Sequence, residues 1–329
     1  MLHEMAGEAG GAESLLRDQT EALVRLGHQV AWLHDGQIER AVDEWRPDCV
    51  HIGTIHNFIG VAPALWLQEN RIPHVWAIMD YWPFCTPRMC MVQGGDGVTD
   101  VSCAAVDGVC DNGCGGRRDD LLPVVNGSFV VALNEVTAEI YRRNGMRCDA
   151  VVQLGIDVER FRPDPAMRTS EVSIYTSSAW AGYPTKGMHI LSRAVKGTPY
   201  GVNLLTGLPR DRVAEELRKA HIYVYPSCYP ETWGLCLTEA MASGCACITT
   251  DVAGASVQVV HGETGLIVPR RDPVALRDAI DWLMGDEELR QRLGEAAREW
   301  AVAHASLEAM GRRWEETYRA AMGVNDGGV

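Results

Sequence analysis

The segment SCYPETWGLCLTEAMASGCACITT, residues 227–250, decides the fold of this chain. Its Leu, Ala and Met residues are good helix formers, and they predict a helix over Leu235–Ser243 with Gly244 at the position of a left-handed C-cap. The run Cys245–Thr250 is short, apolar and β-branched at its end, which predicts a core strand. A helix packed beside such a strand is covered on most sides, so water is scarce around it.

Two glutamates lie in this segment, Glu231 in the loop and Glu239 on the nearly apolar helix. An ionised carboxylate in such a place must be paired or hydrogen-bonded, because desolvation costs several kcal/mol for each ion. Sugar hydroxyls are suitable partners. The alternative is a solvated Glu231 and a Glu239 held in a structural salt bridge, and the spacing of the two glutamates alone favours this alternative.

The predicted first turn of the helix offers a place for an anion, since free backbone N–H groups and the positive end of the helix dipole meet there. The residues of this turn are Thr232, Trp233, Gly234 and Leu235. Because Gly234 has no side chain, an anion can approach closely. The sequence therefore predicts a diphosphate at the helix start, with Glu231 beside the group attached to it and Glu239 one turn further along.

Strand-like and helix-like runs alternate along the rest of the chain, which is the βαβ pattern of parallel sheets. In the first half, His28–His34 and Pro123–Leu133 are among the predicted strands. The residues before Gly10 are too few for a complete first strand, so this strand is either vestigial or truncated. The pattern restarts after residues 151–155. Three long amphipathic helices close the chain, at Pro273–Met284, Asp286–His304 and Ser306–Met322.

Composition limits the class of protein. A chain of 329 residues with 47% hydrophobic content can bury two cores, so we expect two α/β domains, residues 1–154 and 155–329. The formal net charge of -14 argues against a nucleic-acid partner, because no broad basic stripe offsets it. No apolar run is long enough for a membrane span and no signal peptide is recognisable, so the expected compartment is the cytoplasm, with membrane contact at most peripheral.

The order of motifs closely resembles that of the retaining glycosyltransferases of family 4, which have the GT-B fold. Residues 227–250 are similar to the donor-site signature of that family. The other matching segments are GGAESLLRDQTEALVRLGHQV (Gly10–Val30), RPDCVHIG (Arg46–Gly53), LGIDVERFRP (Leu154–Pro163), TKG (Thr185–Gly187) and AGASVQVVHGETGLIVPRRD (Ala253–Asp272). The resemblance implies two Rossmann-like domains with parallel sheets facing a central cleft, and a final helix 306–322 that crosses back to the N-terminal domain.

The resemblance also implies roles for the two glutamates. In such enzymes the glutamate that matches Glu231 holds hydroxyls of the donor sugar, and the one that matches Glu239 holds the ribose. The lysine that matches Lys186 stabilises the departing phosphate, an electrostatic contribution of the kind with the largest typical effect on rate. An exposed turn lysine is the alternative for Lys186.

The chain departs from the family pattern at two places. Relatives commonly have a histidine that reaches the reaction centre where this chain has Met79, which cannot act as an acid, a base or a charged donor. Asp80 or His56 would have to take any polar role on that side. Relatives also tend to have an arginine a few residues before the lysine that matches Lys186, and SAWAGYPTKG has none.

Gly10 and Gly11 precede a predicted helix and can bring backbone amides close to a phosphate or an acceptor. A loop that needs positive φ is the alternative. His56 follows the predicted strand Cys49–Ile52, at the carboxyl end where open α/β sheets bind ligands, so it could face the acceptor. His51 is expected to be structural.

Two features of the sequence bear on metal binding. No Asp-x-Asp sequence occurs in the chain, so a catalytic divalent metal at the diphosphate is not expected. The insertion 85–116 is rich in Gly and Asp and contains Cys85, Cys90, Cys103, Cys110 and Cys114. In a cytoplasmic chain this cluster favours a structural Zn²⁺ held by four thiolates, with an iron–sulfur cluster next and free thiols as the alternative. The other cysteines are expected to be small core residues.

The sequence thus predicts a metal-independent, retaining glycosyltransferase of the hexosyltransferase class. It would move a sugar from a nucleotide diphosphate sugar, with UDP, GDP or ADP as the nucleotide, to a hydroxyl of a saccharide, lipid or small-molecule acceptor. The alternatives are a GT-B hydrolase or epimerase acting on a nucleotide sugar, and a metal-stapled binding protein with a degenerate transferase site.

Overall fold

The computed structural model describes residues 1–2, 11–34, 37–54, 59–83, 91–93, 99–102, 120–177 and 184–324. The chain divides into two compact units, and the main division falls between Leu154 and Gly155. Unit 1 comprises Met1–Val92, Val101–Leu154 and Met310–Val329, and unit 2 comprises Gln93–Asp100 and Gly155–Ala309.

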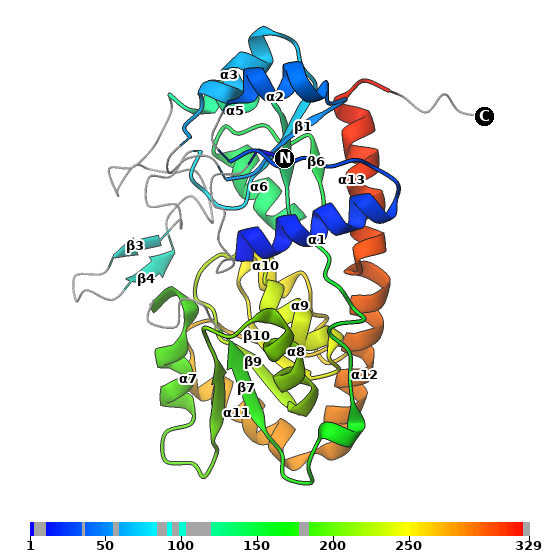
Figure 1. Ribbon diagram of the computed structural model, residues 1–329. Helices are drawn as coiled ribbons and strands as arrows, with labels where there is room; N and C mark the ends of the chain where they lie inside the picture. The colour runs from blue at the N-terminus through cyan, green and yellow to red at the C-terminus, as the bar shows by residue number, and fades with distance from the viewer. Residues whose placement is uncertain are drawn as a thin grey trace. The chain divides into compact units, whose positions relative to one another are not determined.

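Unit 1 contains a four-stranded parallel sheet in the order β1-β2-β5-β6. Its strands are β1 (Val50–Ile52), β2 (His74–Ala77), β5 (Phe129–Ala132) and β6 (Ala150–Val151). Its helices are α1 (Gly11–Arg25), α2 (Ile38–Trp45), α3 (Ala62–Glu69), α5 (Leu122–Asn126), α6 (Glu135–Arg143) and most of α13 (Leu307–Ala321). A separate two-stranded sheet pairs β3 (Met91–Gln93) with β4 (Thr99–Ser102) (Figure 1).

One strand prediction in unit 1 is wrong, and a second is right only in its C-terminal part. Among the described residues, the only bridge from His28–His34 joins Leu33 to Leu2, and Leu2 in turn bridges Ile52. Single bridges supply too few ladder hydrogen bonds to make a strand. Pro123–Leu133 is a short helix, α5, followed by β5. Pro123 occupies the first turn of that helix, where its fixed φ is favourable and its missing N–H costs nothing.

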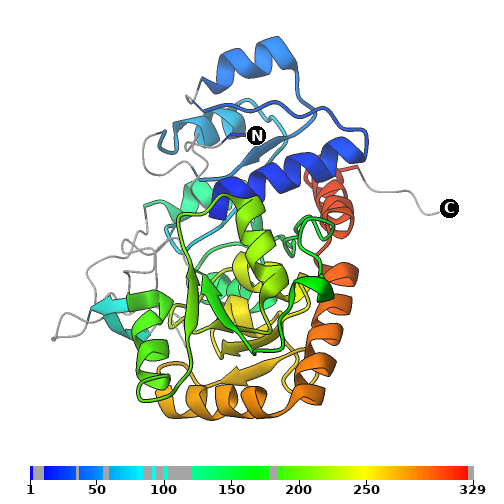
Figure 2. The same cartoon turned by 60° about the horizontal axis from the view of Figure 1, so that its bottom comes forward.

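Unit 2 contains a five-stranded parallel sheet in the order β11-β10-β9-β7-β8 (Figure 2). Its strands are β7 (Ile174–Ser177), β8 (Val202–Leu205), β9 (Ile222–Tyr225), β10 (Ala246–Thr250) and β11 (Leu266–Val268). Its helices are α7 (Met188–Ala194), α8 (Arg210–Lys219), α9 (Leu235–Ala242), α10 (Ala253–Ser256), α11 (Pro273–Gly285) and α12 (Glu287–His304), with short 3-10 turns η1 (Pro165–Met167) and η2 (Pro184–Lys186).

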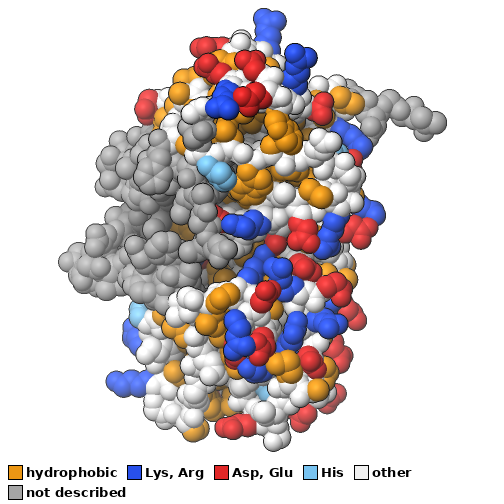
Figure 3. All heavy atoms as spheres, in the orientation of Figure 1, with side chains coloured by type: hydrophobic (Ala, Val, Ile, Leu, Met, Phe, Trp, Pro, Cys, Tyr) orange, Lys and Arg blue, Asp and Glu red, His pale blue; other side chains and the backbone are white. Residues whose placement is uncertain are grey.

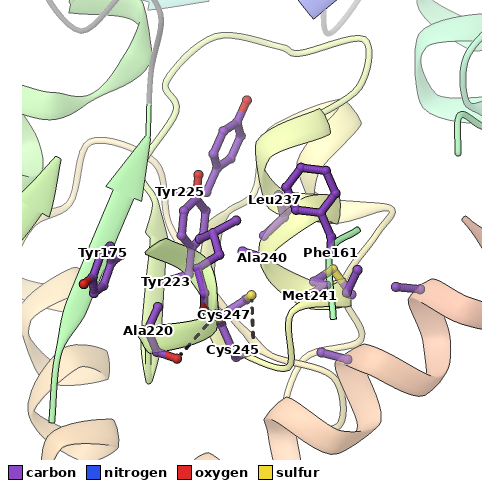
Figure 4. Close-up of a cluster of buried hydrophobic side chains, with 14 of the residues drawn as sticks. Phe161, Tyr175, Ala220, Tyr223, Tyr225, Leu237, Ala240, Met241, Cys245 and Cys247 are labelled. Carbon is purple, nitrogen blue, oxygen red and sulfur yellow. Dashed lines mark hydrogen bonds between the residues drawn. The ribbon is translucent and has the colours of Figure 1, made fainter. Parts of the chain in front are cut away.

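The two faces of this sheet carry separate cores because side chains alternate along each strand. Ile222 and Val224 of β9 pack with α7 and α11 on one face. Tyr223 and Tyr225 pack with α8 and α9 on the other. Figure 4 shows this second core, in which the tyrosines lie between β9 and α9 near Cys247.

The structure confirms the central helix and strand predictions. Helix α9 covers Leu235–Ala242, Gly244 follows it with φ +71°, and the fully buried strand β10 begins at Ala246. The end of α9 also packs closely on α12, since a Cβ at Gly294 would lie 2.5 Å from the carbonyl oxygen of Gly244. The three closing helices are confirmed as α11, α12 and α13.

On the face shown in Figure 3, basic and acidic side chains are intermingled. Among the residues that the structure describes, no helix combines the length and the apolar character that crossing a bilayer requires.

Candidate functional site

Glu231 lies in the loop between β9 and α9 and is buried, with 5% of its surface exposed. Its Oε1 accepts hydrogen bonds from Lys186 Nζ at 2.6 Å and from Ser227 Oγ at 2.9 Å. Burial, and then the negative charge of Glu231, raise the pKa of Tyr225 well above its usual value. Glu231 is therefore an ion-paired group in the protein interior, and the alternative of a solvated carboxylate is wrong.

Lys186 is the last residue of η2 and reaches Glu231 because its turn packs directly on the loop. Gly187 has φ +70°, and a Cβ there would lie 1.8 Å from the carbonyl oxygen of Pro226. The N–H of Cys228 also donates to the carbonyl of Thr185 at 2.8 Å. Only glycine allows both this backbone conformation and this approach. Lys186 is thus a half-buried, ion-paired residue rather than an exposed turn lysine.

The same loop also contacts α10 and is held by a series of buried side-chain hydrogen bonds. A Cβ at Gly254 would lie 2.3 Å from the carbonyl oxygen of Glu231, so α10 touches the loop backbone to backbone. Trp233 Nε1 donates to Thr238 Oγ1 at 3.1 Å, and Thr238 Oγ1 donates to Gln258 Oε1 at 2.6 Å. Gln258 Nε2 then donates to the carbonyl of Gly254 at 2.6 Å. These contacts fix the loop without any regular secondary structure in it.

Glu239 lies in the middle of α9 and is buried, with 7% of its surface exposed. Arg210, the first residue of α8, donates from Nε to Glu239 Oε1 at 3.0 Å. Glu239 therefore forms a salt bridge, as the alternative interpretation of the sequence predicted. The two carboxylates of the donor signature are each paired with a cation, and the cations come from different elements.

One prediction about the helix start needs correction. Thr232, Trp233 and Gly234 do not belong to the first turn, because α9 begins at Leu235 and Gly234 is its N-cap. The carbonyl of Gly234 accepts the N–H groups of Leu237 and Thr238, both at 3.0 Å. Gly234 also packs tightly, since a Cβ there would lie 3.2 Å from Gln258 Nε2. The helix begins at Leu235 as predicted, so only Leu235 of the four residues lies in its first turn.

The thiols around the site are neutral at ordinary pH. Burial, and then the negative charge of Glu239, raise the pKa of Cys236 to about 11. Burial raises the pKa of Cys245 to about 12. Together with the other described free cysteines, which are buried or partly buried, these residues confirm the prediction of small core or near-core positions.

The predicted residues of unit 1 that the structure describes are Asp80, Gly11 and His51. Asp80 Oδ1 accepts the N–H of Trp82 at 2.8 Å. Gly11 is the first residue of α1. His51 is 3% exposed and lies 3.0 Å from the hydroxyl of Tyr318, which confirms its structural role.

Several predicted residues lie outside the described part of the chain: His56, Gly10 and the clustered Cys85, Cys90, Cys103, Cys110 and Cys114. Within the described ranges, no group of three or more His, Cys, Asp or Glu side chains is arranged to hold a metal.

Sequence reasoning missed four polar residues of this site: Arg210, Ser227, Thr238 and Gln258. Arg210 carries a detectable signal, because a cation at the first position of a helix opposes the helix dipole and so calls for a nearby anion. Thr238 and Gln258 are ordinary residues of a helix and a turn, and only the folded structure brings them together.

Comparisons with known proteins match the part of the chain that contains these residues. The sequence profile of the family "Glycosyl transferases group 1" matches residues 188–300. A D-inositol 3-phosphate glycosyltransferase of Corynebacterium diphtheriae is 35% identical over 120 residues, which are 35% of this chain and 28% of that relative. The chain therefore spans less than two thirds of the length of this relative.

The fold is shared with solved structures over nearly the whole chain. Sucrose-phosphate synthase from Thermosynechococcus elongatus has a TM-score of 0.79 at 16% identity, with 98% of each chain covered. An Anabaena protein solved in complex with UDP-glucose has a TM-score of 0.71 at 17% identity, with 97% of this chain and 98% of that chain covered. The fold is GT-B, with two parallel-sheet α/β units. The segment that matches the group 1 glycosyl transferases contains both Arg210 and Glu239.

Proposed function

We propose that the protein is a metal-independent, retaining glycosyltransferase that moves a sugar from a nucleotide diphosphate sugar to an acceptor hydroxyl. The observation that carries the proposal is the ion pair between the half-buried Lys186 and the buried Glu231, which lies directly before the start of α9. The pair supplies a cation for phosphate and an anion for hydroxyls within one water-poor site. The transferase names of the similar proteins support the same reading, so a hydrolase, an epimerase and a pure binding protein are not favoured.

Donor binding would exchange the partners of this ion pair. Lys186 would turn its ammonium toward the diphosphate and stabilise the negative charge that develops on the leaving group. Glu231, still held by Ser227, would accept hydrogen bonds from the sugar. Glu239 would accept those of the ribose, and the start of α9 at Leu235 would present backbone N–H groups and its dipole to the phosphates. Asp80 and His56 remain proposed polar residues of the acceptor side.

The same charges support metal independence. A divalent cation at a diphosphate offsets negative charge, and here Lys186 and the dipole of α9 would do so. A structural Zn²⁺ in the insertion 85–116 and a cytoplasmic location remain predictions.

Turnover with a panel of donors tests the proposal. The purified protein is incubated in chelator with UDP-, GDP- and ADP-sugars and with saccharide, lipid and small-molecule acceptors. D-Inositol 3-phosphate is one of the acceptors, because the similar Corynebacterium protein is named for it. We expect one nucleotide to support transfer, with the anomeric configuration retained in the product by NMR. Activity that requires added Mg²⁺ would contradict metal independence, and inversion would contradict the retaining mechanism.

A further inference from the structure

Arg210 occupies an unfavourable position unless it has a specific partner. As the first residue of α8, its positive charge stands at the positive end of the helix dipole. The neighbouring acid of that turn, Asp211, is exposed and pairs with Arg160 at 3.2 Å. Glu239 is the anion that contacts Arg210, with the side chains 9% and 19% exposed respectively. The buried carboxylate therefore compensates for a cation that the helix alone would disfavour.

A second contact fixes the guanidinium. The Arg210 guanidinium carbon lies 5.2 Å from the centre of the Phe161 ring, within the range of cation–π attraction. Phe161 is fully buried, and its carbonyl accepts a hydrogen bond from Arg298 Nη1 at 2.8 Å. Arg210 thus contacts a fully buried ring and a carboxylate on another helix. Its orientation determines where Glu239 can lie.

We propose that Arg210 is a positioning residue for the ribose of the donor: it fixes the carboxylate of Glu239 and keeps it an anion. The inference rests on the proposed function, since it assigns the ribose to Glu239. A carboxylate removed from water prefers its neutral form unless a cation stands beside it, and a protonated Glu239 would accept ribose hydroxyls poorly. Arg210 acts through Glu239 and is not itself placed at the reacting atoms.

The test measures binding of nucleoside diphosphate and of inorganic pyrophosphate to four proteins by calorimetry. They are wild type, Arg210→Met, Arg210→Lys and the control Arg212→Met. Arg212 lies on the same helix, is exposed, and pairs with Glu215 on the surface. We expect Arg210→Met to weaken binding of the nucleoside diphosphate about tenfold or more, the range of a charge-assisted hydrogen bond, and Arg210→Lys to restore part of it.

Three further readouts separate positioning from a merely structural role. Pyrophosphate affinity should stay at the wild-type level in Arg210→Met, because pyrophosphate has no ribose. The fall in nucleotide affinity on acidification should begin at higher pH in Arg210→Met. In a Glu239→Gln background, Arg210→Met should cause no further loss, because the group through which Arg210 acts is then already neutral.

The outcomes distinguish the two proposals. If wild type binds none of UDP, GDP or ADP, the proposed function fails. If wild type binds one of them and both Arg210 variants bind it as well as Arg212→Met does, the role of Arg210 is wrong. Equal losses of pyrophosphate and nucleotide, or additive losses in the double variant, would also overturn it.

Discussion

The loop that carries Glu231 and the helix that carries Glu239 adjoin in sequence, yet different forces hold them. The loop 226–234 has no regular structure. It is held by contacts with η2 and α10 and by the hydrogen bonds that join Trp233, Thr238 and Gln258. Helix α9 is held by its own hydrogen bonds, by apolar packing on β9 and β10, and by the close contact of Gly244 with α12.

This difference shows where the geometry of the site is vulnerable. A change in the loop's distant supports moves Glu231 and leaves the helix in place. A change in the core under α9 alters the stability of unit 2 before it alters the position of one carboxylate. The predictions below test this separation, starting with the largest expected effect.

Replacing Gly254 with alanine should disable the loop. The added Cβ would lie 2.3 Å from the carbonyl oxygen of Glu231 and 2.7 Å from the backbone nitrogen of Trp233, so the loop backbone must move. A displacement of about 1 Å at a catalytic group can cost about a hundredfold in rate. We expect turnover to fall by about that factor, measured with the best donor of the panel.

Gly201→Ala is the matched control, because a Cβ at Gly201 meets nothing within 4 Å. It should retain wild-type turnover. Equal activity of the Gly254 and Gly201 variants would show that the loop does not depend on the close contact with α10.

The two glutamates should respond differently to the same substitution. Glu239→Gln removes the charge that would hold the ribose, so nucleoside diphosphate binding should weaken about 10-fold to 100-fold, from roughly 1.5 to 3 kcal/mol per charge-assisted hydrogen bond. Glu231→Gln removes a partner of the sugar and releases Lys186 from its ion pair, so nucleotide affinity should be unchanged or higher while turnover falls. Calorimetry and initial rates give the two quantities. Equal changes of nucleotide affinity in both variants would show that the division of roles is wrong.

Because the Cys245 thiol is buried in the core next to α9, we expect the folded protein to lose stability at high pH. The pKa of Cys245 is raised from 9.0 to about 12 in the folded protein, so above pH 9 the unfolded chain releases this proton and the folded chain keeps it. The unfolded state then binds fewer protons, and stability falls as pH rises from 9 toward 12. At pH 10 this thiol alone should shift the folding equilibrium about tenfold toward unfolding.

Cys245→Ala removes this thiol from the titration. Urea unfolding at pH 8 and pH 10 in reducing buffer should therefore show a smaller pH dependence for Cys245→Ala than for wild type. Nucleotide affinity at pH 8 should stay near the wild-type value, because Cys245 lies in the core and not among the proposed donor-binding residues. An identical pH dependence in the two proteins would mean that this thiol ionises as readily folded as unfolded.

Much of the fold was predictable because local rules and burial agree along unit 2. The periodicity of α9 and β10, the glycine at 244 and the proline that begins α11 each determine an element from a few neighbouring residues. In unit 1 the same rules failed at His28–His34. That run is strand-like by composition, but a strand exists only where a partner pairs along its length, and in the part of the chain that the structure describes Leu33 bridges one residue, Leu2.

The sequence by itself determined the two α/β halves, the donor-site signature and the identity of Glu231, Glu239 and Lys186 as candidate residues, since chain order and residue type suffice for these. Only the tertiary structure decided which cation stands beside which carboxylate. Lys186 and Glu231 are far apart in the chain, as are Arg210 and Glu239, and they meet because parallel strands bring the ends of separate βα units to one edge of the sheet. Pairings of this kind depend on distances between distant residues, and those distances are set by packing rather than by any local pattern.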